Sequence, residues 1–295
     1  MKIERILKTA ESISHIQRWK YMIGLGRDSV NDKSLSNSLL KLTSSEIHYE
    51  RLLALMSAHG SYNKEIIVNL LTDPSIAGMF SAVKLAATHL DDELLTDITP
   101  KLPNKKRMGI VKVLVKKRRF SVIERIYDKS SVLVQKDLLL YTSEPFFKEH
   151  ADGEVMESLS QEHWRLMAKR FPALAYEELK KILNENSEPS WLAQTAVQAV
   201  LQQFYKTAPA MGISLLKCAI LSIHPHMLPL ERYAVLFPES VAELTLGHSA
   251  QIHFIFPVSA LRELQNEKLC AMAKNYLAFK ILAFQFTQIF PKITS

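Results

Sequence analysis

The chain has 295 residues, of which 47% are hydrophobic and 23% charged, and its formal net charge at pH 7 is +7. This composition excludes an intrinsically disordered chain, because disorder requires low hydrophobicity and high net charge. Only eight glycines are present, which argues against β-hairpins and glycine-rich phosphate loops, since both need residues with positive φ.

Two cysteines, Cys218 and Cys270, stand far apart in the sequence. Two distant thiols do not form the disulfide framework that small secreted domains use. The first residues carry acidic side chains and lack the apolar core of a signal peptide. We therefore expect an intracellular, cytoplasmic protein. The basic run at 116–119 resembles a short nuclear import signal, which leaves the nucleus open.

The first predicted element is an amphipathic helix over residues 1–23, in which apolar residues recur at helical spacing. Gly24 and Gly26 are expected to end this helix, and residues 24–40 to form a polar connection. The two glycines do not make a dinucleotide-binding loop, because no strand precedes them and the third glycine of that motif is missing.

Helix starts are indicated by three segments in which a hydroxyl residue stands three positions before Glu or Gln. These capping boxes are Thr43–Glu46, Ser121–Glu124 and Ser158–Gln161. Together with the periodicity, they predict helices near residues 45–59, 63–72, 76–90, 104–117, 159–170, 173–184, 191–206, 210–222 and 239–247.

Nine basic residues and no acidic one stand between Ile98 and Ile123. On a helix, four of them share one face, with apolar residues opposite: Lys105, Lys112, Lys116 and Arg119. Such a face is either a solvated surface that keeps the chain soluble or a site for an acidic partner or nucleic acid. The candidate binding residues are Lys105, Lys106, Lys112, Lys116, Lys117 and Arg119.

Between residues 166 and 246 an apolar helix, a proline and a second apolar helix follow one another three times. The prolines are Pro172, Pro209 and Pro238, separated by 37 and 29 residues, and two-helix repeats have such periods. Proline suits the first helical position, because its missing N–H would have no partner there anyway. Three residues beyond each proline no side chain is large: Ala175, Gly212 and Val241.

The turn Asp73-Pro74-Ser75, followed by small apolar residues at 82–87, resembles HEAT-type (armadillo-like) repeats, in which the second helix opens after such a turn. The resemblance covers residues 40–250, although Gly78-Met79-Phe80 stands where many such repeats have an arginine. It implies an all-α fold, a right-handed α-α superhelix (solenoid) of HEAT-like helical hairpins that forms a single domain over residues 1–295.

The C-terminal part is expected to form a connector over 250–258 and a helix over 259–264. Residues 275–290 are apolar almost all round, so we expect a helix buried against the preceding hairpin or another molecule. The apolar stretch 276–290 is shorter than the roughly 20 residues that a membrane span needs. We therefore expect no membrane span.

No catalytic residue, cofactor or metal site is predicted. His224 and His226 are close in sequence, but no cysteine or carboxylate nearby completes a zinc site. His163 stands at a helix start, where we expect it to cap the helix or to pack. Cys218 lies in an apolar run, and we expect a buried, inert thiol.

A stack of helical hairpins is an interaction architecture. Our first hypothesis is a non-catalytic scaffold that mediates protein–protein interaction. The alternative is a nucleic-acid-binding helical-repeat protein that uses residues 101–119, because a cationic face attracts phosphate backbones without sequence preference. A third hypothesis is an enzyme, because helical-repeat alkylpurine DNA glycosylases resemble this chain in size, basic charge and all-helical repeats.

Overall fold

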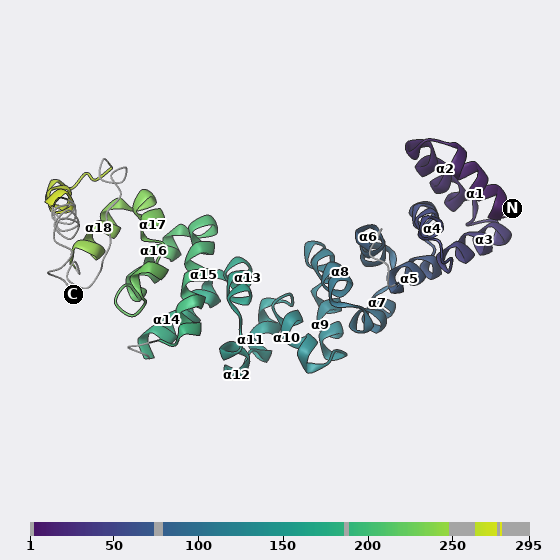
Figure 1. The fold of residues 1–295 in the computed structure, drawn as a ribbon. Helices are drawn as coiled ribbons and strands as arrows, with labels where there is room; N and C mark the ends of the chain where they lie inside the picture. Colours follow the sequence, from purple (N-terminus) through teal and green to yellow (C-terminus); the bar gives the residue numbers. More distant parts are fainter. Residues whose placement is uncertain (1–2, 74–78, 186–188, 248–262, 276–277, 279–295) are drawn as a thin grey trace, which may run out of the picture. The chain divides into compact units, whose positions relative to one another are not determined.

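The computed structural model describes residues 3–73, 79–185, 189–247, 263–275 and 278. Within these ranges, every element of regular structure is a helix (Figure 1), which confirms the all-α prediction. Contacts divide the chain into two compact units, Met1–Asp152 and Gly153–Ser295. We call them unit 1 and unit 2 and describe each by itself.

Unit 1 begins with α1 and ends with α11. Its helices are α1 (Ile3–Ser12), α2 (His15–Asp28), α3 (Lys33–Thr43), α4 (His48–Ser61), α5 (Lys64–Thr72), α6 (Met79–His89), α7 (Asp92–Ile98), the 3₁₀-helix η1 (Thr99–Lys101), α8 (Asn104–Lys116), α9 (Phe120–Asp128), α10 (Val132–Leu139) and α11 (Glu144–His150).

Unit 2 begins with the short helix α12. Its helices are α12 (Gly153–Glu157), α13 (Gln161–Arg170), α14 (Pro172–Glu185), α15 (Trp191–Thr207), α16 (Pro209–Ala219), the 3₁₀-helix η2 (Pro225–Met227), α17 (Leu230–Leu236) and α18 (Pro238–Gly247). Residues 267–275 are also helical. The nine helices predicted between residues 45 and 247 are confirmed, with ends that differ by a few residues.

The N-terminal prediction is wrong, because residues 1–23 do not form one helix and residues 24–40 are not a polar connection. A capping box starts α2: the Ser14 side chain accepts from the Gln17 N–H, and the Gln17 Oε1 atom accepts from the Ser14 N–H at 3.1 Å. The helix α3 then occupies most of the expected connection, capped by Asp32, whose side chain accepts from the Leu35 N–H.

Gly26 lies inside α2 because α4 crosses there at very short distance. A Cβ atom on Gly26 would come within 2.0 Å of the Ser57 carbonyl oxygen, and one on Gly60 within 2.1 Å of the Ile23 carbonyl oxygen. Each glycine thus faces the backbone of the other helix. Glycine lowers the helix propensity at these two positions, but the missing Cβ atoms allow the two backbones to pack closely.

The three predicted capping boxes are also wrong in position. Thr43 is the last residue of α3, and α4 starts after Ile47 without a side-chain cap. Ser121 lies inside α9, which starts one residue earlier. The third box is shifted by two residues: Ser160 caps α13 together with His163, which confirms the expected capping role of this histidine.

The helices of unit 1 pack in two rows (Figure 1). In the first, which we call the even row, α2 packs on α4, α4 on α6 and α6 on α8. In the second, the odd row, α3 packs on α5 and α7 on α9. Helices that follow each other, such as α5 and α6, join the rows, and a core of buried aliphatic side chains lies between them.

In unit 2, α13 packs on α15 and α14 on α16, and the three proline joints share one backbone conformation. The residue before each proline has φ and ψ of −131° and 63° at Phe171, −152° and 61° at Ala208, and −136° and 62° at Phe237. Each of these residues donates its N–H to the carbonyl four residues earlier, at 2.7–2.8 Å. Two of the side chains three residues beyond the prolines, Ala175 and Val241, are fully buried.

Tyr233 of α17 fills the position that Gly212 of α16 leaves open. Its ring is fully buried, and its hydroxyl donates to the Leu201 carbonyl of α15 at 2.9 Å. A Cβ atom on Gly212 would overlap the hydroxyl. Burial, followed by the neighbouring Tyr205, raises the pKa of the Tyr233 phenol.

The predicted connector over 250–258, the helix over 259–264 and almost all of the C-terminal helix over 275–290 lie outside the described residues. Among the helices that the structure describes, none has the length and the apolar composition needed to cross a bilayer. The single domain over residues 1–295 stays a prediction.

Candidate anion-binding face

The basic residues of α8 separate into buried and exposed groups. Lys106 is 4% exposed and Arg107 9%, whereas Lys105, Lys112, Lys116 and Lys117 are exposed. The first two point into unit 1, because α8 is packed by α6, α9 and η1. Neighbouring positions on a helix face different sides, so basic residues next to each other in sequence end in different surroundings.

Lys106 binds the end of α5 rather than solvent. Its ammonium donates to the Leu71 carbonyl at 2.8 Å and to the Asp73 carbonyl. Carbonyls at a helix C-terminus have no partner within the helix, so a cation there satisfies them and interacts favourably with the helix dipole. Burial lowers the pKa of Lys106, and the Asp73 carboxylate partly opposes this shift.

Arg119 is also held within unit 1. Its Nη1 atom donates to the Ala87 carbonyl of α6 at 2.8 Å, and its Nη2 atom pairs with the Asp92 carboxylate of α7. Lys106 and Arg119 were predicted as binding residues, but these contacts assign both to joining helices.

Three aspartates in or just before α7 are paired with cations in or next to α5 and α9. Asp91 accepts from Lys64 of α5 at 2.6 Å, Asp92 pairs with Arg125 of α9 at 3.0 Å, and Asp97 pairs with Lys129 at 2.5 Å. The hydrogen bonds from Lys64 and Lys129 are the main reason that the pKa values of Asp91 and Asp97 are lowered. These carboxylates therefore do not neutralise the exposed cations of α8.

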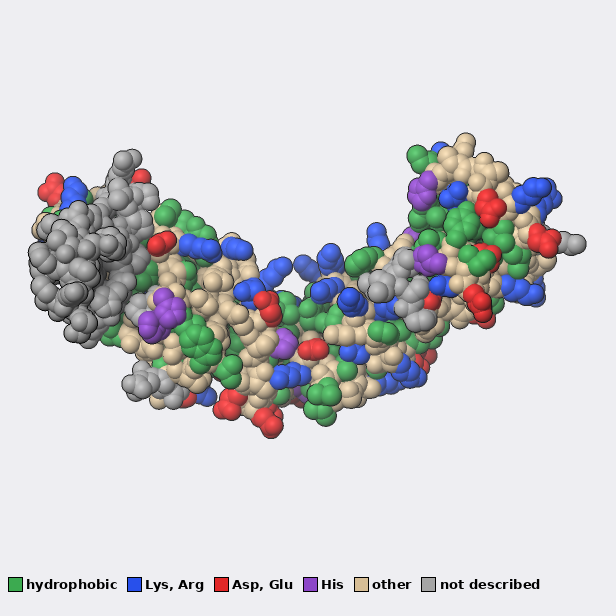
Figure 2. Space-filling model, in the orientation of Figure 1, with side chains coloured by type: hydrophobic (Ala, Val, Ile, Leu, Met, Phe, Trp, Pro, Cys, Tyr) green, Lys and Arg blue, Asp and Glu red, His purple; other side chains and the backbone are tan. Residues whose placement is uncertain are grey.

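The exposed cations of α6 and α8 form no ion pair with any residue that the structure describes. Neither helix contains an acidic residue. Because α6 and α8 pack side by side, their cations share one surface, and Figure 2 shows Lys and Arg side chains gathered in this part of unit 1. We call this surface the basic face: Lys84, Lys105, Lys112, Lys116, Lys117 and Arg118.

The C-terminal end of the basic face is a fixed turn. Arg118 has a φ of 56°, in the left-handed region. Its N–H donates to the Val115 carbonyl at 3.0 Å, and the Arg119 N–H donates to the Leu114 carbonyl at 3.0 Å. This pair of bonds is a Schellman motif, in which glycine is the usual left-handed residue. The turn fixes the backbone of Lys117 and Arg118, the two cations that follow α8.

Partly exposed rings lie on the neighbouring helices of the even row. Tyr62, after α4, stacks on His89 of α6 with ring centroids 4.0 Å apart. Trp19 of α2 meets His59 of α4 edge-on at 5.4 Å. Phe80, one turn before Lys84 on α6, is 82% exposed. Cations beside exposed rings are the side chains that hold single-stranded nucleic acid.

The sequence did not indicate that Lys84 belongs to the basic face or that His59 and His89 lie near it. Each is separated from residues 101–119 by a dozen positions or more, and only the packing of α4, α6 and α8 brings them together. The signal in the sequence was weak: α6 is a helix without any acidic residue whose Lys84 stands among apolar side chains.

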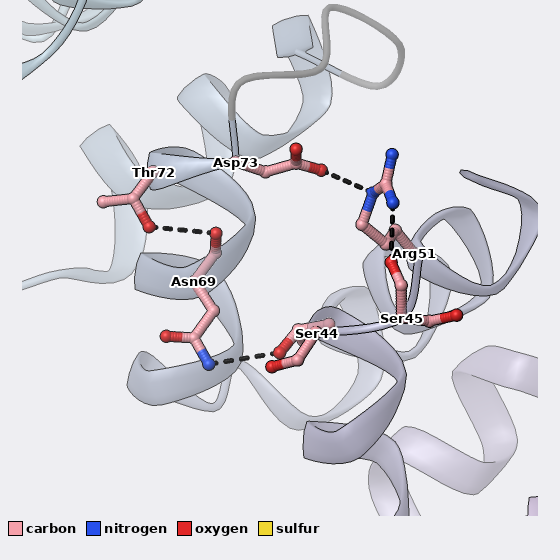
Figure 3. Close-up of a pocket in the computed structure, with 7 residues that line it drawn as sticks. Ser44, Ser45, Arg51, Asn69, Thr72 and Asp73 are labelled. Atoms are coloured by element: carbon pink, nitrogen blue, oxygen red, sulfur yellow. Dashed lines mark hydrogen bonds and ion pairs between the residues drawn. The ribbon is translucent and has the colours of Figure 1, made fainter. Parts of the chain in front are cut away.

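A second feature of unit 1 is a polar pocket of about 750 Å³ at the junction of α3, α4 and α5 (Figure 3). Arg51 pairs with the Asp73 carboxylate at 2.8 Å and donates to the Ser45 carbonyl at 2.6 Å. Asn69 donates to the Thr43 hydroxyl at 3.1 Å. These contacts join α3, α4 and the end of α5, so this pocket is a structural junction.

Two histidines of unit 2 lie close together. The rings of His224 and His226 lie 4.2 Å apart, and no group of three His, Cys, Asp or Glu side chains suited to a metal ion is found in the described ranges. Cys218 is half-buried rather than fully buried.

Comparison with known protein families, with curated proteins and with solved structures finds no match to this chain.

Proposed function

We propose that the chain is a non-catalytic α-helical repeat scaffold, a right-handed solenoid of HEAT-like hairpins, and that it binds a partner protein. The shared backbone conformation of the three proline joints supports repeats, since the same helix–proline–helix unit recurs. Repeat proteins of this kind contact only their neighbours along the chain and present long surfaces to partners.

The spacing of side-chain contacts between hairpins also supports repeats. Hydrogen bonds that join one hairpin to the next connect residues 26–35 positions apart: Asn69 to Thr43, Lys64 to Asp91, Lys106 to Leu71 and Tyr233 to Leu201. This is the interval expected when each two-helix unit packs on the preceding one.

The basic face is the observation that carries the proposal for a binding surface. Its six cations have no carboxylate partner among the described residues, whereas Asp91, Asp92 and Asp97, in or just before α7, are paired. An acidic segment of a partner protein would supply the missing charge. Charge complementarity of this kind raises the rate and the specificity of association.

Charge reversal tests the surface. The variant K105E/K112E/K116E reverses three exposed cations that face away from the core, so we expect the fold to persist and binding of a fluorescent twelve-residue polyglutamate peptide to be lost. The matched control is K8E/K33E/K41E, which changes the net charge equally at exposed positions of α1 and α3. If both variants lose affinity equally, only net charge matters and the proposed face is wrong.

Nucleic-acid binding on the same face is the second candidate function, and the exposed ring of Phe80 beside Lys84 favours it. The same variants are tested with a twenty-nucleotide oligothymidylate. Each phosphate contact on a single strand changes the slope of log affinity against log salt by about 0.7, so K105E/K112E/K116E should flatten the slope by about 2. Oligothymidylate that binds more tightly than polyglutamate would decide for nucleic acid. No contact in the described structure favours a glycosylase.

A further inference from the structure

We infer that the basic face binds its anionic partner more tightly at mildly acidic pH, because protonation of His59 and His89 adds two positive charges beside it. The inference rests on the proposed function, in which this face binds an anion. The histidines would make the affinity of this face depend on pH, which the lysines cannot do. Histidine is the side chain whose unperturbed pKa lies between pH 5 and 8.

The two histidines lie in the seam between α4 and α6. His59 Nε2 is 2.7 Å from the Ser81 hydroxyl of α6, and its ring meets the edge of Trp19 of α2. His89 ends α6 and stacks on Tyr62, which follows α4. Both rings are therefore held by neighbouring helices, and their positions relative to α6 are fixed by packing.

Cations of the basic face are the charged groups that act on these rings. Burial first, then Lys84 of α6 and His89, lower the pKa of His59. Burial first, then Lys117 after α8, lower the pKa of His89. Besides these groups, Trp19 of α2 contacts the His59 ring, and Tyr62, which follows α4, contacts the His89 ring. These influences disfavour the imidazolium form, so both histidines gain their positive charge at a lower pH than an unperturbed imidazole.

Coupling between the anion and the protons follows from linkage. A bound polyanion beside Lys84 and Lys117 offsets the repulsion that these lysines exert on the imidazolium ions, so it raises both histidine pKa values. Affinity must then rise as the pH falls, because the complex binds more protons than the free protein. Two full charges added at about 8 Å from a phosphate, in the dielectric of water, would raise affinity by up to about fivefold.

The test compares oligothymidylate affinity at pH 7.5 and pH 5.5 at constant salt, because its phosphates do not titrate in this range. The wild-type chain should bind more tightly at pH 5.5 than at pH 7.5, by up to about fivefold, and H59Q/H89Q should show the same affinity at both pH values. The control H224Q/H226Q changes a histidine pair of unit 2 and should keep the gain. H89Q alone, at an exposed position, should lose about half of it.

The histidine titrations give a readout that does not depend on activity. NMR of the imidazole Cε1 protons should place both pKa values below 6.5 in the free protein and shift them upward when oligothymidylate is added. Unchanged affinity between the two pH values, or an equal gain in H59Q/H89Q, would overturn the inference and leave the proposed binding face standing. Absence of binding by both probes at every pH would overturn both.

Discussion

Arg118 adopts a backbone conformation that costs an L-residue free energy. The left-handed region disfavours residues with a Cβ atom by about 1–2 kcal/mol, and glycine does not incur this cost. We expect R118G to raise the free energy of unfolding by about 0.5–1 kcal/mol after the entropy of glycine is subtracted. Urea denaturation, with comparison of midpoints at equal slope, measures the change.

Tyr62 provides the matched control, because it is the other non-glycine residue with positive φ in the described structure, at 49°. Y62G removes the same backbone cost but also the stacking on His89, which is worth about 0.5–1.5 kcal/mol. It should therefore gain less stability than R118G. A lower stability of R118G than wild type would show that the arginine side chain contributes more than its backbone costs.

Lys106 and Lys105 are neighbours in sequence with opposite roles. In K106M the Leu71 carbonyl loses its donor at a buried position and the Asp73 carbonyl at a partly buried one. We expect a loss of about 1–3 kcal/mol of stability, the cost of leaving buried acceptors unsatisfied. K105M changes an exposed side chain and should stay within about 0.5 kcal/mol of wild type. Equal effects of the two substitutions would contradict the assignment of Lys106 to the end of α5.

At the scale of the elements, the crossing of α2 and α4 depends on two glycines. G60A would place a Cβ atom against the Ile23 carbonyl, so the helices must separate, and overpacking of this kind costs about 1–3 kcal/mol. G24A on α2 meets no atom within 4 Å and should stabilise the helix by up to about 1 kcal/mol through its higher propensity. Thermal unfolding followed by circular dichroism distinguishes the two. A destabilised G24A would show that the crossing is wrongly described.

At the scale of the molecule, the positive charge belongs to unit 1. Unit 1 holds 24 of the 37 basic residues and 18 of the 30 acidic ones. It therefore carries six of the seven net positive charges of the chain. We expect residues 1–152, produced alone, to remain helical and to bind the anionic probes within about twofold of the full chain, because distant sites act independently. Residues 153–295 should bind neither probe. Binding by unit 2 alone would place the site elsewhere.

Nine helices between residues 45 and 247 could be predicted, because helix periodicity and proline act locally, but others in this range, such as α10 and α11, could not. Pro172, Pro209 and Pro238 end one helix and open the next through their own ring geometry, whatever packs around them. The same local rules failed at Gly26, since a glycine that looks like a helix breaker in sequence is kept inside α2 by the backbone of α4.

The sequence by itself determined an all-helical chain, its hairpin joints and one segment dense in positive charge. Only the tertiary structure decided which of those charges are exposed: Lys106 is taken by the end of α5 and Arg119 by α7, while Lys84 of α6 joins the basic face. The physical reason is that a helix fixes the direction of each side chain, but the groups it meets come from helices some thirty residues away.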